Sequence, residues 1–166
     1  MILSTPDLIT SLQNEVRILL HLASKIDRAK LDYRPSPKQR STIELLKYLS
    51  IMGPGLVEAA KAGSFDRARW TAVEQTAAAR GFAAEHLDLA GEVGVGHAGQ
   101  QSRVGVGMRR NRGERLIEVA RGAFIVNLVL CGCAAYRTQL FLYLKAQGRD
   151  ELSTMNLWGG VDAPAS

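Results

Sequence analysis

The sequence predicts an all-α protein: a four-helix bundle that forms a single domain over residues 1–166. Its length of 166 residues suits one domain with one hydrophobic core. Alanine and leucine are abundant and β-branched runs are few, a composition that favours helix. Four segments also combine apolar residues at helical spacing with a start or stop signal.

The first expected helix covers residues 7–26, directly after Pro6, which suits a first turn. Its apolar residues recur every three or four positions: Leu8, Leu12, Val16, Leu19, Ala23 and Ile26.

The second expected helix begins at the sequence Ser-Thr-Ile-Glu over residues 41–44. This is a capping box, in which Ser41 caps the first turn and Glu44 reaches back to the Ser41 amide. We expect Gly53-Pro54-Gly55 to kink or interrupt the helix near its middle, and Gly63-Ser64 to end it.

Two further helices complete the expected bundle. A weak apolar stripe with many alanines predicts a third helix over residues 70–89. A strongly apolar segment predicts the last helix over 116–147, ended by Gly148. The tail over 149–166 carries Leu157 and Trp158, which we expect to fold back onto the bundle.

Residues 91–113, GEVGVGHAGQQSRVGVGMRRNRG, show neither a helical nor a strand period and are expected to form a mobile loop. The segment and its flank hold much of the net charge of +5. A nucleic-acid surface would usually add aromatic side chains that stack on bases, and this segment has none. We therefore expect a solvated basic loop and no nucleic-acid partner.

The chain shows no secretion signal and no uncharged apolar run of the roughly 18 residues that a membrane span needs. Its two cysteines fit a reducing compartment. These observations predict a cytoplasmic protein without a membrane segment.

The stretch LCGCAAYRTQLFLYLKAQG raises the question of a metal or redox site. Cys131 and Cys133 stand two positions apart on an expected helix, so their side chains point about 200° apart. They cannot share one metal or one disulfide without breaking the helix, and core packing is the expected role of a buried cysteine.

The same helix places Cys133, Tyr136, Leu140 and Tyr143 on one inward stripe, which Tyr48 and Met52 of the second helix can face. Inward tyrosine hydroxyls need hydrogen-bond partners, and a polar pocket is one way to supply them. The predicted pocket therefore consists of Tyr48, Met52, Cys133, Tyr136, Leu140 and Tyr143.

Two motifs, LDYRPSPKQRSTIELLKYLS and AAYRTQLFLYLKAQGRDEL, resemble the DinB/YfiT-like family of bacterial four-helix bundles. Members with the full pattern are similar to metal-dependent enzymes, some of them thiol S-transferases or isomerases. The resemblance implies a metal held between helices by three histidines.

Those three positions fall here on Tyr48, Gly132 and Tyr136, with Cys133 replacing Gly132 if the spacing slips by one. Neutral tyrosine is a poor ligand for a divalent metal, so we expect a degenerate metal site and no cofactor. A Zn or Ni ion on other ligands is the alternative. The histidines present, His21, His86 and His97, share no liganding spacing.

Three functions follow from these residues. The first is a non-metal bundle that binds a small molecule or works as a homodimer. The second is a metal-dependent or thiol-dependent enzyme of transferase or hydrolase type, in which a catalytic tyrosine would need a nearby cation to lower its pKa. The third is a nucleic-acid or acidic-partner binder that uses the arginine-rich loop. The sequence favours the first.

Overall fold

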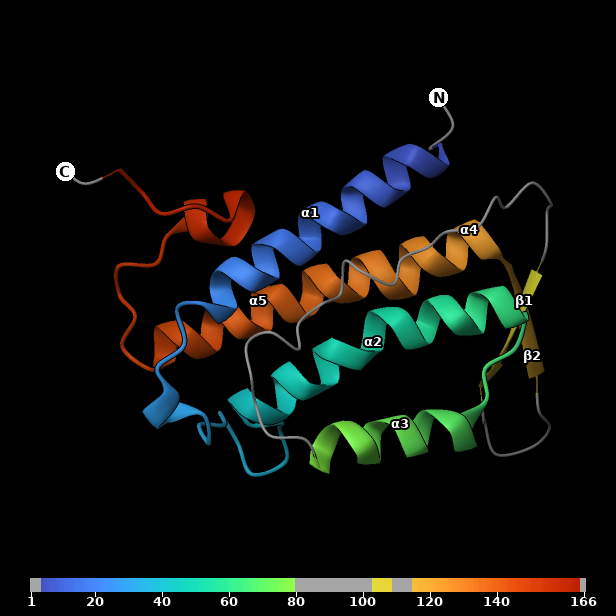
Figure 1. Cartoon of the computed structure of the whole chain (residues 1–166), viewed down its shortest axis with the longest axis horizontal. Helices are drawn as coiled ribbons and strands as arrows, with labels where there is room; N and C mark the ends of the chain where they lie inside the picture. The colour runs from blue at the N-terminus through green and yellow to red at the C-terminus, as the bar shows by residue number, and fades with distance from the viewer. Residues whose placement is uncertain (1–3, 80–102, 109–114, 165–166) are drawn as a thin grey trace.

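The computed structural model describes residues 4–79, 103–108 and 115–164, with the backbone alone over 103–108 and 115–121 (Figure 1). These residues are mostly helical, as the sequence predicts, and compatible with a helical bundle. The elements are α1 (Thr5–Ala23), a 3₁₀ turn (Arg28–Lys30), α2 (Thr42–Ala62), α3 (Arg67–Ala79), β1 (Arg103–Met108), β2 (Arg115–Ala120), α4 (Arg121–Phe124), a π-helical segment (Ile125–Leu130), α5 (Cys131–Ala146) and a π-helical turn (Met155–Gly159).

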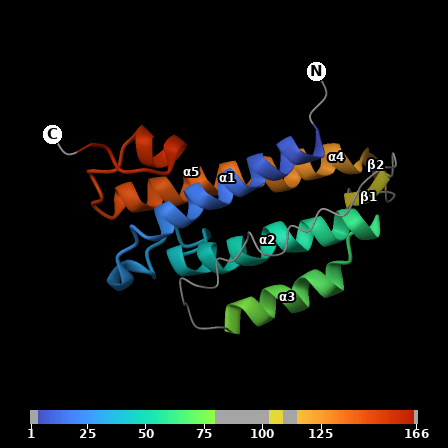
Figure 2. The same cartoon turned by 45° about the horizontal axis from the view of Figure 1, so that its top comes forward.

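The helices lie in three layers, which Figures 1 and 2 show from two sides. α1 packs along α5, α2 packs beneath them, and α3 covers the outer face of α2. α2 is therefore the middle layer, with one face toward the core and the other toward α3. The residues of the main core cluster come from α1, α2, α5 and the tail; they include Leu19, Leu45, Leu49, Leu140 and Leu144.

The helix boundaries follow local capping chemistry. Ser41 and Glu44 form the predicted capping box, because the Ser41 amide donates to Glu44 Oε2 at 2.7 Å. Gly63 ends α2 in the left-handed region at φ 75°. Gly148 follows α5 at φ 93°, and its amide donates to the Lys145 carbonyl at 3.0 Å. Both predicted helix ends are confirmed.

α2 is not interrupted at Gly53-Pro54-Gly55: it runs as one helix of 21 residues with Pro54 inside. A proline inside a helix costs about 3 kcal/mol. The neighbouring Met52 and Val57 are fully buried, and each such side chain contributes about 1.5–3 kcal/mol. Core packing on both sides of the proline therefore outweighs the missing hydrogen bond.

The prediction of a helix from residue 116 is wrong, since residues 115–120 form β2. β2 pairs antiparallel with β1, with Gly105 opposite Glu118. Val104, Val106, Ile117 and Val119 recur at every second position, which is strand spacing. The continuous helical rod, which consists of α4, the π-helical segment and α5, begins at Arg121 instead.

The hairpin also changes two other expectations. Residues 103–108 of the predicted 91–113 loop are strand, so the described residues are not purely α-helical. The rest of that loop lies outside the described residues.

The third helix spans Arg67–Ala79 in place of 70–89, and residues 80–89 lie outside the described part.

One helical stretch within the described residues, Gly122–Ala146, is long and apolar enough to cross a membrane by length and composition alone. It carries Arg137 near its middle, where the side chain is only 4% exposed. Arg137 Nη1 donates to Glu15 Oε1 of α1 at 2.8 Å, and the Trp158 ring lies 4.9 Å from the guanidinium carbon. A buried ion pair covered by the folded-back tail thus joins α1 to α5.

Replacing Glu15 with alanine should lower the free energy of unfolding by about 3–5 kcal/mol, because Arg137 would remain buried without its partner. Urea denaturation followed by circular dichroism measures this change. Glu151→Ala, which removes a solvent-exposed partner of Arg149, is the control and should leave stability nearly unchanged. Equal effects of the two substitutions would contradict the structural role of the Glu15–Arg137 pair.

Candidate functional site

The structure brings the three positions implied by the family resemblance together where α2 packs on α5. The Tyr48 and Tyr136 rings meet edge to face, with centroids 5.1 Å apart. A Cβ added at Gly132 would lie 3.3 Å from Met52 Sδ, one helical turn along α2 from Tyr48. Two of the three positions therefore carry aromatic rings, and the Met52 thioether packs against the third, Gly132.

Tyr48 is held in its neutral form. Burial raises its pKa to about 12, and the neighbouring Tyr136 phenol adds to the shift. The Arg40 guanidinium lies 4.0 Å from the centre of the Tyr48 ring and does not reverse it. A group with such a pKa does not act as a general base near neutral pH.

Four of the six predicted pocket residues are closely packed core: Met52, Cys133, Leu140 and Tyr143. The Tyr143 hydroxyl donates to the Arg40 carbonyl at 2.9 Å and accepts from Gln139 Nε2 at 2.7 Å. This inward tyrosine is therefore satisfied by protein groups and needs no pocket. Contact of the six residues with a ligand remains a prediction.

The two cysteines differ as their helical spacing predicts. Cys131 is exposed, whereas Cys133 is 2% exposed. Burial raises the pKa of the Cys133 thiol to about 11, and the nearby Glu15 adds to the shift. Cys133 is thus a packed thiol with little thiolate at neutral pH.

The described residues hold no group of three or more His, Cys, Asp or Glu that could bind a metal ion. His21 lies on α1, where its Nε2 is 3.1 Å from Asn156 Nδ2 and 3.7 Å from Asp162 Oδ1. It joins α1 to the tail, as a boundary histidine would. His86 and His97 lie outside the described residues.

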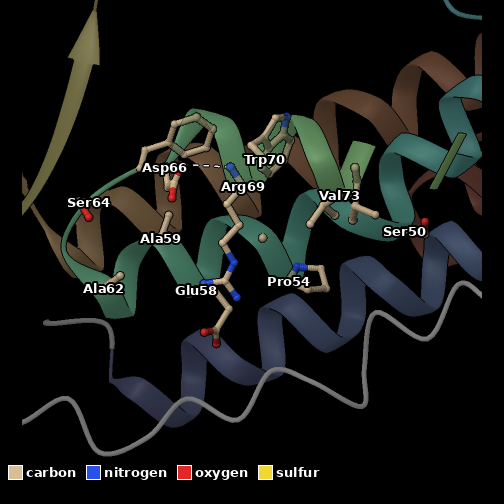
Figure 3. Close-up of a pocket in the computed structure, with 13 residues that line it drawn as sticks. Ser50, Pro54, Glu58, Ala59, Ala62, Ser64, Asp66, Arg69, Trp70 and Val73 are labelled. Carbon is tan, nitrogen blue, oxygen red and sulfur yellow. Dashed lines mark hydrogen bonds between the residues drawn. The ribbon is translucent and has the colours of Figure 1, made fainter. Parts of the chain in front are cut away.

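A cavity of about 580 Å³ lies on the other face of α2, against α3, and the sequence did not indicate it (Figure 3). One stripe of α2 lines it, together with the short α2–α3 connection and the first half of α3. The lining residues are Ser50, Ile51, Pro54, Gly55, Glu58, Ala59, Ala62, Ser64, Phe65, Asp66, Arg69, Trp70 and Val73.

Trp70 forms the aromatic wall of this cavity because Gly55 has no side chain. A Cβ at residue 55 would lie 2.7 Å from Trp70 Cζ3, so only glycine lets the indole contact the backbone of α2. Phe65 extends the aromatic wall, with its ring centroid 5.5 Å from that of Trp70. Gly55 and Trp70 are not neighbours in the sequence, so only the fold shows that they pair.

Charged groups stand at the rim from both helices. Figure 3 shows Arg69 reaching from α3 toward Glu58 of α2. Glu58 Oε1 is 2.8 Å from Lys61 Nζ, and this hydrogen bond lowers the pKa of Glu58. Asp66 Oδ1 accepts the backbone amide of Arg69 at 3.0 Å.

A smaller cavity of about 210 Å³ lies farther along the same α2–α3 seam. Arg40 and Glu74 face each other there at 3.9 Å, and Tyr48 forms part of the wall. Tyr48 is therefore the one predicted pocket residue that lines either of these two cavities.

Comparison of the chain with protein families, with curated proteins and with solved structures gives no match. The site must therefore be interpreted from its own residues.

The exposed and buried thiols give a direct prediction. Native protein should react rapidly with Ellman's reagent at only one thiol, Cys131, since Cys133 is buried with a pKa of about 11. Cys131→Ser should abolish the rapid phase, and both thiols should react in urea. A rapid phase that survives in Cys131→Ser would show that Cys133 is accessible.

Gly55→Ala should displace the Trp70 indole from α2 and shift its fluorescence emission to longer wavelength as the ring becomes more hydrated. The measurement uses a Trp158→Phe background, which leaves Trp70 as the only tryptophan. Gly122→Ala is the matched control, because a Cβ there meets no atom within 4 Å. Unchanged emission in Gly55→Ala would contradict the close contact.

Proposed function

We propose that this protein is a non-metal, small-molecule-binding helical bundle of DinB/YfiT-like type, and that its ligand occupies the α2–α3 cavity. The observation that carries the proposal is the cavity itself, about 580 Å³ with Trp70 and Phe65 in its wall. Small-molecule sites are typically clefts of about 300–1,000 Å³ with mostly apolar linings and a few polar groups.

The residues at the family's metal positions support a ligand other than a metal. Tyr48 and Tyr136 pack against each other, and a tyrosine with a pKa of about 12 supplies no anionic oxygen at neutral pH. Imidazole, thiolate and carboxylate are the groups that zinc prefers. The degenerate-site interpretation therefore agrees with the chemistry of the side chains present.

An enzyme that uses a thiol or an unrecognised metal site is the second candidate, and the resemblance in sequence favours it. The accessible thiol for such chemistry would be Cys131, since Cys133 is buried with a raised pKa. We also propose a cytoplasmic location and a homodimer, with exposed apolar residues such as Leu128 and Leu142 on the helical rod available for self-association.

Metal content separates the non-metal proposal from the metalloenzyme. Protein purified without a histidine tag should contain no stoichiometric metal by elemental analysis. The variant Tyr48→His/Gly132→His/Tyr136→His should gain about one divalent ion per chain, because it restores three imidazoles at adjoining positions. Stoichiometric metal in the native protein would overturn the proposal.

Ligand binding is tested with N-phenyl-1-naphthylamine, a neutral aromatic dye that fluoresces in apolar surroundings. It should bind saturably to the native protein and at least about fivefold more weakly to Trp70→Ala, which removes the aromatic wall. Trp158→Phe, which changes the other tryptophan, should bind the dye like the native protein. Absence of saturable binding would contradict a small-molecule site.

A further inference from the structure

We infer that the α2–α3 cavity takes a flat aromatic acid, with its ring against Trp70 and Phe65 and its carboxylate or sulfonate facing Arg69. This inference rests on the proposed function and specifies the chemical class of ligand. It follows from two properties of the cavity: the shape and polarity of its inner wall, and a rim guanidinium that forms no ion pair within 4 Å among the described residues.

The inner wall selects a planar, apolar group. Ile51, Pro54 and Ala59 supply aliphatic surface from α2, and the Trp70 indole closes the opposite side. Phe65 stands at 43° to the indole plane, so the two rings form an angled aromatic corner. Aromatic rings pack favourably in edge-to-face or offset geometry against such a corner.

Three charged side chains lie at the rim: Glu58, Asp66 and Arg69. The Arg69 charge acts on Glu58, since it adds to the lowering of that carboxyl's pKa by Lys61. Glu58 pairs with Lys61 at 2.8 Å, and the Asp66 carboxylate accepts the amide of Arg69. Among the described residues, no carboxylate oxygen lies within 4 Å of the Arg69 guanidinium.

The guanidinium is thus a rim cation that an anionic group on a ligand can approach. Arginine presents a planar fork of N–H donors that matches a carboxylate or sulfonate. A cationic ligand would have to compete with Lys61 for Glu58 and would face Arg69 as a like charge. The arrangement therefore favours an anionic group on the ligand.

Two dyes with one skeleton test this charge preference. 8-Anilinonaphthalene-1-sulfonate carries the same rings as N-phenyl-1-naphthylamine and adds one sulfonate. At fixed low salt, the native protein should bind the sulfonated dye about fivefold more tightly than the neutral dye. Arg69→Met, which keeps a long apolar chain, should lose this preference and still bind the neutral dye.

Arg67→Met is the matched control. Arg67 is an exposed arginine on the same helix and does not line the cavity, so its loss changes the net charge equally. The Arg67→Met variant should prefer the sulfonated dye to within about twofold of the native value. Circular dichroism and thermal unfolding establish that both variants are folded.

The outcomes separate the two proposals. If neither dye binds the native protein saturably, the proposed function fails, and the ligand class fails with it. If the neutral dye binds and the sulfonate gives no advantage, the small-molecule site stands and the inferred acid is wrong. Loss of the preference in both Arg69→Met and Arg67→Met would also overturn the inference, since it would reflect net charge alone.

Discussion

The contact between the Trp70 indole and the α2 backbone at Gly55 is the constraint on which the α2–α3 half of the molecule depends. Ala77 is the only fully buried residue of α3, so few other side chains hold that helix in place. The indole both attaches α3 to α2 and keeps the two helices far enough apart to leave a cavity. The middle layer of the fold therefore has a closely packed core face and an open outer face.

The Gly-Pro-Gly sequence of α2 has different consequences on these two faces. Gly53 is buried on the core side, whereas Pro54 and Gly55 line the cavity. Local propensity disfavours all three residues in a helix. Tertiary packing overrides that preference, and the outer face keeps the close backbone approach that small residues allow.

Local chemistry made the helix ends predictable from sequence. The Ser41–Glu44 capping box, Gly63 and Gly148 each act within a few residues of their own position. The hairpin was not predicted, because β2 spans only six residues and directly precedes a long apolar helix. Its alternating apolar residues were therefore assigned to that helix.

The candidate site was less predictable, because it depends on pairs of residues far apart in the chain. The Glu15–Arg137 pair, which lies outside the site, shows the same limit: Arg137 resembles a surface residue in sequence, yet its partner lies 122 positions away. The cavity lies between two helices whose facing surfaces each carry only a weak apolar pattern. The tyrosine positions were found through family resemblance, and their ring contact was visible only in the fold.

The folded-back tail, which contains the Met155–Gly159 turn, covers a side of α1 that does not face α5. Gly160, at φ 59°, sits directly on Ile18, which is fully buried, and Arg17 donates hydrogen bonds to the carbonyls of Gly159 and Gly160. Proteolytic clipping before the Met155–Gly159 turn would uncover Ile18 on a face that the bundle core does not protect. The clipped species would expose this aliphatic side chain on its first helix and would aggregate more readily.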